Sequence, residues 1–169
     1  MNEEEIIQNK DNKEFILKAV KENGKFLDLT SEEFKNDKEV VMTALEQDPE
    51  SLEFASEELK KDKEVIMKGV NGAPWTVCYA SEKLRADREI IFESCKTYGQ
   101  ALYYSSMELR DDREIVKTAV ENKGIIIKYA SDRLRNDKEL AMIAVKQDKQ
   151  AYHFISQELQ QDEEIKGLI

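Results

Sequence analysis

Residues 37–61 read DKEVVMTALEQDPESLEFASEELKK, and close variants of this segment recur every 25 residues from residue 12 to residue 161 without insertion or deletion. The clearest marker is the opening string of an acidic, a basic, an acidic and an apolar residue. It begins at Asp37, Asp62, Asp87, Asp112 and Asp137, with a weaker copy at Asn12. A fixed period of this kind is typical of stacked-repeat proteins, in which one unit cannot bury its apolar face alone.

The segment itself predicts two helices. Asp37 is suited to cap the first helix, and Glu39 adds negative charge near the positive end of the helix dipole. Apolar residues follow at helical spacing: Val40, Val41, Ala44 and Leu45. This helix is predicted to end near Pro49, where four other repeats carry Gly24, Pro74, Gly99 and Gly124. Because 25 residues is short for a two-helix repeat, the second helix must be short or partly tightened to three residues per turn.

Each repeat also carries a serine at one fixed position: Ser31, Ser56, Ser81, Ser106, Ser131 and Ser156. A leucine or phenylalanine stands three positions later. We interpret the serine as a cap on a short final turn and the apolar residue as a plug in the core. A row of nucleophiles is disfavoured, since no base accompanies any of these serines.

The pattern therefore predicts an all-α solenoid of six 25-residue two-helix repeats with short terminal caps. The predicted repeats are residues 12–36, 37–61, 62–86, 87–111, 112–136 and 137–161, and the predicted caps are residues 1–11 and 162–169. We number the repeats one to six in this order.

These residues resemble a known bacterial repeat family. The opening Asp62-Lys63-Glu64-Val65-Ile66 and the ending Tyr79-Ala80-Ser81-Glu82-Lys83-Leu84-Arg85 are similar to repeats of DUF4116, a family of unknown function. The resemblance covers most of the chain and implies a helical-repeat fold. It brings no catalytic residue, cofactor or established activity.

The composition narrows the range of possible functions further. The formal net charge is −10, from 36 acidic and 26 basic residues, which disfavours direct binding of nucleic acid. No apolar run is long enough for a membrane span, and the acidic start is unlike a secretory signal, so we expect a cytoplasmic protein that does not contact membranes. The sequence contains no phosphate-binding glycine loop, metal-ligand set or nucleophile triad, and we therefore expect neither an enzyme, nor a cofactor, nor a metal.

Positions that carry the same type of residue in every repeat are interpreted as structural. We expect the glutamate that follows each marker's basic residue, as at Glu39, to form lateral ion pairs with a basic row. That row is Lys35, Lys60, Arg85, Arg110 and Arg135. An aromatic row is expected to belong to the core: Tyr79, Tyr104 and Tyr129, with Leu29, Phe54 and Phe154 at the same position.

Positions that vary between repeats are the candidates for function. Two of them turn from charged residues in repeats one and two to mostly apolar or aromatic residues in repeats three to five. The candidate partner-binding residues are Trp75, Cys78, Tyr98, Tyr103, Ile125 and Lys128. Exposed aromatic residues of this kind often anchor partner proteins. For Trp75, packing onto its neighbours and contact with a partner both remain open.

Two functions of different classes follow. The favoured one is a monomeric, non-enzymatic scaffold that presents an extended helical surface to a protein partner. The alternative is an acidic inhibitor or nucleic-acid mimic that blocks a basic groove of a target enzyme, although the mixing of basic residues among the acids disfavours it. Salt discriminates between them, because a complex held by charge weakens steeply with ionic strength. An enzyme using Cys78 or His153 is a third and weaker possibility.

Overall fold

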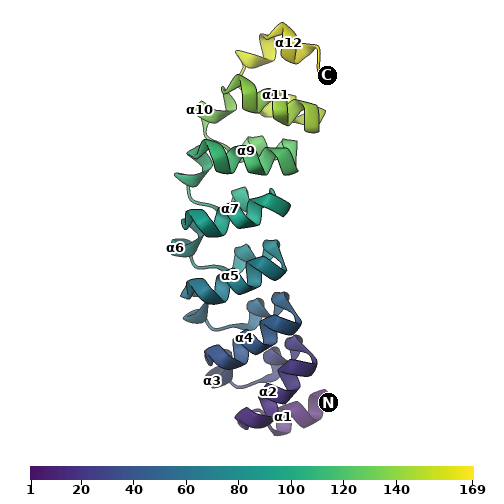
Figure 1. The fold of residues 1–169 in the computed structure, drawn as a ribbon, viewed down its shortest axis with the longest axis vertical. Coiled ribbons are helices and arrows are strands. Elements are labelled where there is room, and N and C mark those ends of the chain that lie inside the picture. The colour runs from purple at the N-terminus through teal and green to yellow at the C-terminus, as the bar shows by residue number, and fades with distance from the viewer. The chain divides into compact units, whose positions relative to one another are not determined.

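The computed structural model describes all 169 residues and contains α-helices and 3-10 helices with no strand (Figure 1). The chain divides into two compact units, Met1–Leu84 and Arg85–Ile169, which we call unit 1 and unit 2. Within each unit the long helices of neighbouring repeats pack side by side. The predicted all-α repeat fold is confirmed. None of the helices has both the length and the apolar character that a membrane crossing requires.

The elements follow one another in the order that the repeats dictate. Unit 1 contains α1 (Glu3–Gln8), α2 (Lys13–Glu22), η1 (Gly24–Leu29), α3 (Glu32–Lys35), α4 (Lys38–Gln47), η2 (Pro49–Phe54), η3 (Leu59–Lys61), α5 (Lys63–Gly72) and η4 (Pro74–Tyr79). The short helix α6 (Glu82–Arg85) lies at the division between the units. Unit 2 contains α7 (Arg88–Thr97), α8 (Ala101–Tyr104), η5 (Leu109–Asp111), α9 (Arg113–Asn122), η6 (Gly124–Tyr129), α10 (Asp132–Arg135), α11 (Lys138–Gln147), η7 (Lys149–Phe154), η8 (Leu159–Gln161) and α12 (Glu163–Lys166).

The long helix of each repeat begins and ends as predicted. In α4, the Asp37 carboxylate accepts from the backbone N–H groups of Glu39 at 3.0 Å and Val40 at 3.3 Å. The apolar face of this helix is buried and the helix ends before Pro49. The second helix is a 3-10 helix of six residues in five of the six repeats, which confirms the prediction of a tightened second helix.

Alternate repeats differ in their final turn, which the sequence analysis did not predict. Repeats one, three and five end in a four-residue α-helix, namely α3, α6 and α10. Repeats two, four and six end in a three-residue 3-10 turn, namely η3, η5 and η8. The structural period is therefore 50 residues, or two repeats.

The serine row joins neighbouring repeats as well as capping turns. The Ser56 hydroxyl accepts from the Leu59 N–H at 3.1 Å, and Ser106, Ser131 and Ser156 cap in the same way. The Ser56 N–H donates to the Lys35 carbonyl of the preceding repeat at 2.9 Å, a bond that recurs at the five serines from Ser56 onward. The cap prediction is wrong at Ser31 and Ser81, whose hydroxyl oxygens are buried without a hydrogen-bond partner.

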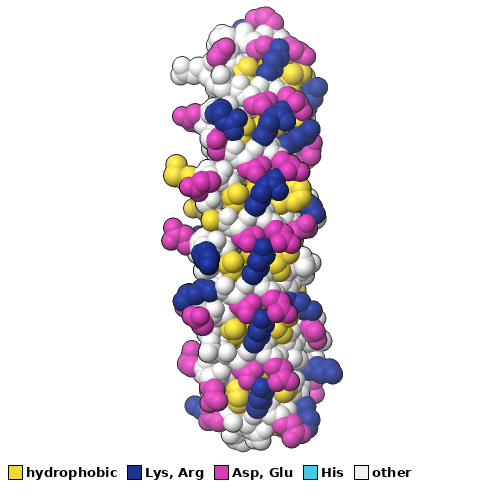
Figure 2. All heavy atoms as spheres, turned by 60° about the vertical axis from the view of Figure 1, so that its left-hand side comes forward, with side chains coloured by type: hydrophobic (Ala, Val, Ile, Leu, Met, Phe, Trp, Pro, Cys, Tyr) yellow, Lys and Arg dark blue, Asp and Glu magenta, His cyan; other side chains and the backbone are white.

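Ion pairs do link neighbouring repeats, but the prediction named the wrong basic row. The Lys38 ammonium lies 2.7 Å from a carboxylate oxygen of each of Asp62 and Glu64 in the next repeat. The second residue of the marker makes the same double contact in four other repeats: Lys13, Arg88, Arg113 and Lys138. Within each unit, dark-blue and magenta side chains accordingly alternate in a column (Figure 2). The predicted basic row, which begins with Lys35, does not make these contacts.

Candidate partner-binding surface

The six candidate residues fall into two groups that the structure describes separately. Trp75 and Cys78 belong to η4 of unit 1, whereas Tyr98, Tyr103, Ile125 and Lys128 belong to unit 2.

In unit 1, Trp75 packs against the preceding repeat and remains partly exposed. Its side chain is 45% exposed. Its indole Nε1 donates to the Glu50 carboxylate of the preceding repeat at 3.1 Å. Cys78 is half-buried and forms no disulfide. Trp75 is thus held against its neighbour while half of its surface remains free.

In unit 2, Tyr103 lies at the centre of a cluster of rings. Its ring centroid lies 5.1 Å from that of Tyr104 and 5.0 Å from that of Tyr129 in the next repeat. Tyr103 itself is 50% exposed. Neighbouring rings at these separations attract one another beyond the area they bury, which holds the cluster in place.

The aromatic row was wrongly predicted to belong to the core. Tyr104 and Tyr129 are half-buried, and so are the other members of that row: Leu29, Phe54, Tyr79 and Phe154. The row therefore contributes to the surface as well as to the packing between repeats.

The remaining candidates differ in their relation to this cluster. Tyr98 is the residue that ends α7, and Ile125 lies in the first turn of η6; both are half-buried. No ring contact joins Tyr98 to the tyrosine cluster. The Lys128 ammonium, in contrast, lies 4.9 Å from the ring centroid of Tyr129 and 5.8 Å from that of Phe154.

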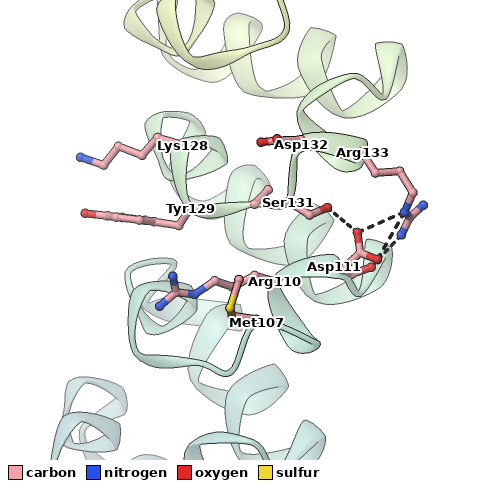
Figure 3. Close-up of a pocket in the computed structure, with 9 residues that line it drawn as sticks. Met107, Arg110, Asp111, Lys128, Tyr129, Ser131, Asp132 and Arg133 are labelled. Carbon is pink, nitrogen blue, oxygen red and sulfur yellow. Dashed lines mark hydrogen bonds and ion pairs between the residues drawn. The ribbon is translucent and has the colours of Figure 1, made fainter.

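Beside the cluster the surface of unit 2 is hollowed into a depression of about 610 Å³, which we call the Tyr129 depression. Figure 3 shows Lys128, Tyr129 and Arg110 extending toward the same side, with Tyr129 between the two basic side chains. Asp111 and Arg133 lie at the opposite side of the view.

Met107, at the edge of this depression, is the functional candidate that the sequence analysis missed. Its side chain is 82% exposed, more than that of any other large apolar residue in the chain. The signal was nevertheless in the repeat, because every other repeat has an acidic or amide side chain at this position. These residues are Glu32, Glu57, Glu82, Asp132 and Gln157.

Met107 stands where most other repeats have an acid, and the contacts of Arg110, three positions later, differ accordingly. In repeat two, the Lys60 ammonium lies 3.0 Å from the carboxylate of Glu57. Repeats one and five have equivalent pairs, Lys35 with Glu32 and Arg135 with Asp132. Arg110 instead donates from Nε to the Ser105 carbonyl at 3.2 Å and from Nη2 to the Tyr103 carbonyl at 2.5 Å. Arg110 therefore has no carboxylate partner.

The two acids that line the depression are already occupied. The Asp111 carboxylate accepts from the Ser131 hydroxyl and from Arg133 Nε, the latter at 3.1 Å. The hydrogen bond from Ser131, followed by that from Arg133, lowers the pKa of Asp111 below its ordinary value. Asp132 is paired with Arg135. Lys128 has no carboxylate within ion-pair distance, so Lys128 and Arg110 are the unneutralised cations of the depression.

Three segments of the chain, residues 12–60, 62–110 and 112–160, match the family model described as "Domain of unknown function (DUF4116)". The chain belongs to the DUF4116 family. Each match spans two of the 25-residue repeats, in agreement with the 50-residue alternation of the final turn. The comparisons with curated proteins and with solved structures gave no match.

No three His, Cys, Asp or Glu side chains gather closely enough to hold a metal ion. Burial raises the pKa of the Cys95 thiol to about 12, so this thiol stays protonated and is a poor nucleophile at neutral pH. Cys95 fills a core position of α7, as the sequence predicted.

Proposed function

We propose that this protein is a non-enzymatic, monomeric scaffold that captures another protein through an aromatic surface of unit 2. This surface, which we call the Tyr–Met surface, consists of Tyr103, Tyr104, Met107 and Tyr129. The observation that carries the proposal is the exposure of Met107 and Tyr103, 82% and 50%, beside two half-buried tyrosines. Clustered exposed aromatic residues and methionine are enriched where proteins bind partners.

The ring contacts make this surface suited to binding. Tyr103 is positioned by Tyr104 and Tyr129 before any partner arrives, so little side-chain freedom remains to be lost on association. Methionine adds a flexible and polarizable side chain that adapts to the shape of a partner.

The alternative of an acidic mimic has weaker support. A mimic of nucleic acid needs rows of free carboxylates, but Asp62, Glu64 and their equivalents within the units are bridged by lysine or arginine. Paired acids project a weaker field than free ones. An enzyme based on His153 is also poorly supported, since the ring contacts of this exposed side chain are with Tyr152 rather than with a catalytic partner.

The test is affinity capture from the native host with the full chain and three single variants, identified by mass spectrometry. Tyr103→Ala removes the central ring, and we expect recovery of the specific partner to fall about tenfold, as for an interface hot spot. Glu53→Ala is the matched control, because Glu53 is the exposed residue at the same position of repeat two. Trp75→Ala tests unit 1 separately.

Circular dichroism and urea unfolding confirm that each variant is folded. Equal recovery with Tyr103→Ala and Glu53→Ala contradicts the proposal. A complex that survives at low salt and disappears at high salt, irrespective of Tyr103, supports the acidic mimic instead.

A further inference from the structure

The contacts within the repeats show what a cation at the position of Arg110 binds. In repeats one, two and five the equivalent side chain pairs with a carboxylate three residues earlier. In repeat six both members are neutral, Gln157 and Gln160. Repeat four alone in unit 2 keeps the cation while an apolar residue, Met107, replaces the acid. The geometry that elsewhere holds an internal carboxylate is therefore open to an external one.

Arg110 retains donors for such a ligand. A guanidinium has five N–H groups, and the two hydrogen bonds to the carbonyls of Ser105 and Tyr103 use two of them. These bonds fix the plane of the group without neutralising its charge. The remaining N–H groups can bind a carboxylate with two parallel hydrogen bonds.

Lys128 provides a second cation on the other side of Tyr129, as Figure 3 shows. Its contacts with the rings of Tyr129 and Phe154 orient the ammonium but leave its positive charge uncompensated. Arg110 and Lys128 thus both line the depression and carry positive charge that no carboxylate neutralises.

We propose that the partner presents a short acidic segment, whose Asp or Glu carboxylates pair with Arg110 and Lys128 while an apolar side chain packs on Met107 and Tyr129. This inference rests on the proposed function of the Tyr–Met surface and specifies its partner. A carboxylate is favoured over a phosphate dianion because it is the group that the cations equivalent to Arg110 bind in repeats one, two and five.

The experiment starts from random 12-residue peptides displayed on phage and selected on the full chain. We expect enrichment of peptides that combine Asp or Glu with an aromatic or aliphatic residue. The best peptide is then synthesised with a fluorescein label, and its dissociation constant is measured by fluorescence polarization.

Two substitutions of one residue separate charge from apolar contact. Met107→Glu restores the acid that repeats one and two carry, which should occupy Arg110 internally and weaken the peptide about tenfold or more. Met107→Gln, the residue type of repeat six, removes the apolar contact but leaves Arg110 open, and should weaken the peptide only about threefold. Arg110→Gln and Lys128→Gln should each match the effect of Met107→Glu. Lys60→Gln, at the position of Arg110 in repeat two, should leave binding unchanged.

The outcomes distinguish this inference from the proposed function. If the selected peptides lack acids, or if Met107→Glu and Met107→Gln weaken binding equally, the acidic partner is wrong. If Tyr103→Ala nevertheless abolishes binding, the proposed role of the Tyr–Met surface is retained. Peptides that bind Tyr103→Ala normally overturn the surface itself. Failure to enrich any peptide, or tighter binding of a labelled 12-nucleotide oligo-dT than of the best peptide, also overturns the inference.

Discussion

Repeats two and four are built on the same plan and differ at a few informative positions. Each has a ten-residue α-helix, a short second helix and a final 3-10 turn: α4, η2 and η3 in unit 1, and α7, α8 and η5 in unit 2. Repeat four replaces Pro49 by Gly99 at the turn and Glu57 by Met107 at the surface. Only the replacement at the turn is matched by a second replacement in the following repeat.

The replacement at the turn is compensated by the next repeat. Pro49 has no N–H and lies against Gly72, where an added Cβ would come within 2.3 Å of the proline Cγ. Gly99 has an N–H, which donates to the Asn122 side chain at 2.8 Å, and Asn122 stands where Gly72 stands in the earlier pair. In unit 1 the proline therefore lies opposite a glycine, whereas in unit 2 the glycine lies opposite an asparagine side chain.

The replacement at the surface has no such compensation. Loss of the acid at residue 107 leaves Arg110 without a carboxylate, and no residue of unit 2 supplies another. The comparison separates a change that the next repeat compensates within the fold from a change that leaves a cation without its internal carboxylate partner.

The largest expected effect comes from mixing the two kinds of turn. Gly72→Asn places the side chain of repeat five opposite Pro49, and the clash should cost about 2 kcal/mol of unfolding free energy. Adding Pro49→Gly should recover much of this loss, because it recreates the pair of Gly99 and Asn122. Urea unfolding of the two single variants and the double variant measures the coupling. Strictly additive effects would show that the two residues do not face each other as described.

A smaller effect is expected in the core of repeat four. Ser94 is fully buried and its hydroxyl has no hydrogen-bond partner, whereas repeat two has Ala44 at this position. Ser94→Ala should therefore stabilise the protein by about 1 kcal/mol, since a buried hydroxyl without a partner is unfavourable. Thermal unfolding followed by circular dichroism provides the measurement. A loss of stability would mean that the hydroxyl is hydrogen-bonded after all.

The smallest effect concerns the ion pairs between neighbouring repeats. Burial by itself raises the pKa of Asp112, but the hydrogen bonds from Arg88 and the first-turn amides outweigh it and lower the pKa. For Asp62, the hydrogen bond from Lys38 is the main cause of a lowered pKa. A lowered folded pKa adds stability that is complete above the unfolded value of about 4 and is lost as the pH falls through the folded value.

Asp112→Asn and Asp62→Asn keep the helix cap and remove the charge. We expect each to lower stability by about 0.5–1 kcal/mol at pH 7 and by less near pH 2, because the difference disappears as the aspartate becomes protonated in the native chain. Urea unfolding at both pH values provides the comparison. A penalty of the same size at pH 2 would assign the effect to capping instead of charge.

Most of the scaffold was predictable from local chemistry. Asp37 and its equivalents mark the starts of helices, Pro49 and Gly99 mark their ends, and Ser56 marks the final turn, because each of these roles depends on one residue and its own backbone. The alternation of the final turn was not predictable in this way, since residues such as Asn36 and Lys61 carry no comparable signal.

The surface was harder to predict because exposure depends on packing between repeats. Tyr129 was assigned to the core from its regularity, although its row is half-buried. Tyr103 and Lys128 were identified from their variability, and the structure joins both to Tyr129. Met107 was not among the predicted residues, although the sequence shows that it replaces an acidic or amide residue found at this position in every other repeat.

The most direct test of the account places a photo-crosslinking side chain at equivalent positions of repeats two and four. p-Benzoylphenylalanine replaces Tyr103 in one full-length variant and Glu53 in another, and each is irradiated in the native host. The account predicts an adduct of one defined mass from residue 103, lost when Met107→Glu is added, and little or none from residue 53. Adducts of equal yield from both positions, or an adduct from residue 53 alone, would contradict it.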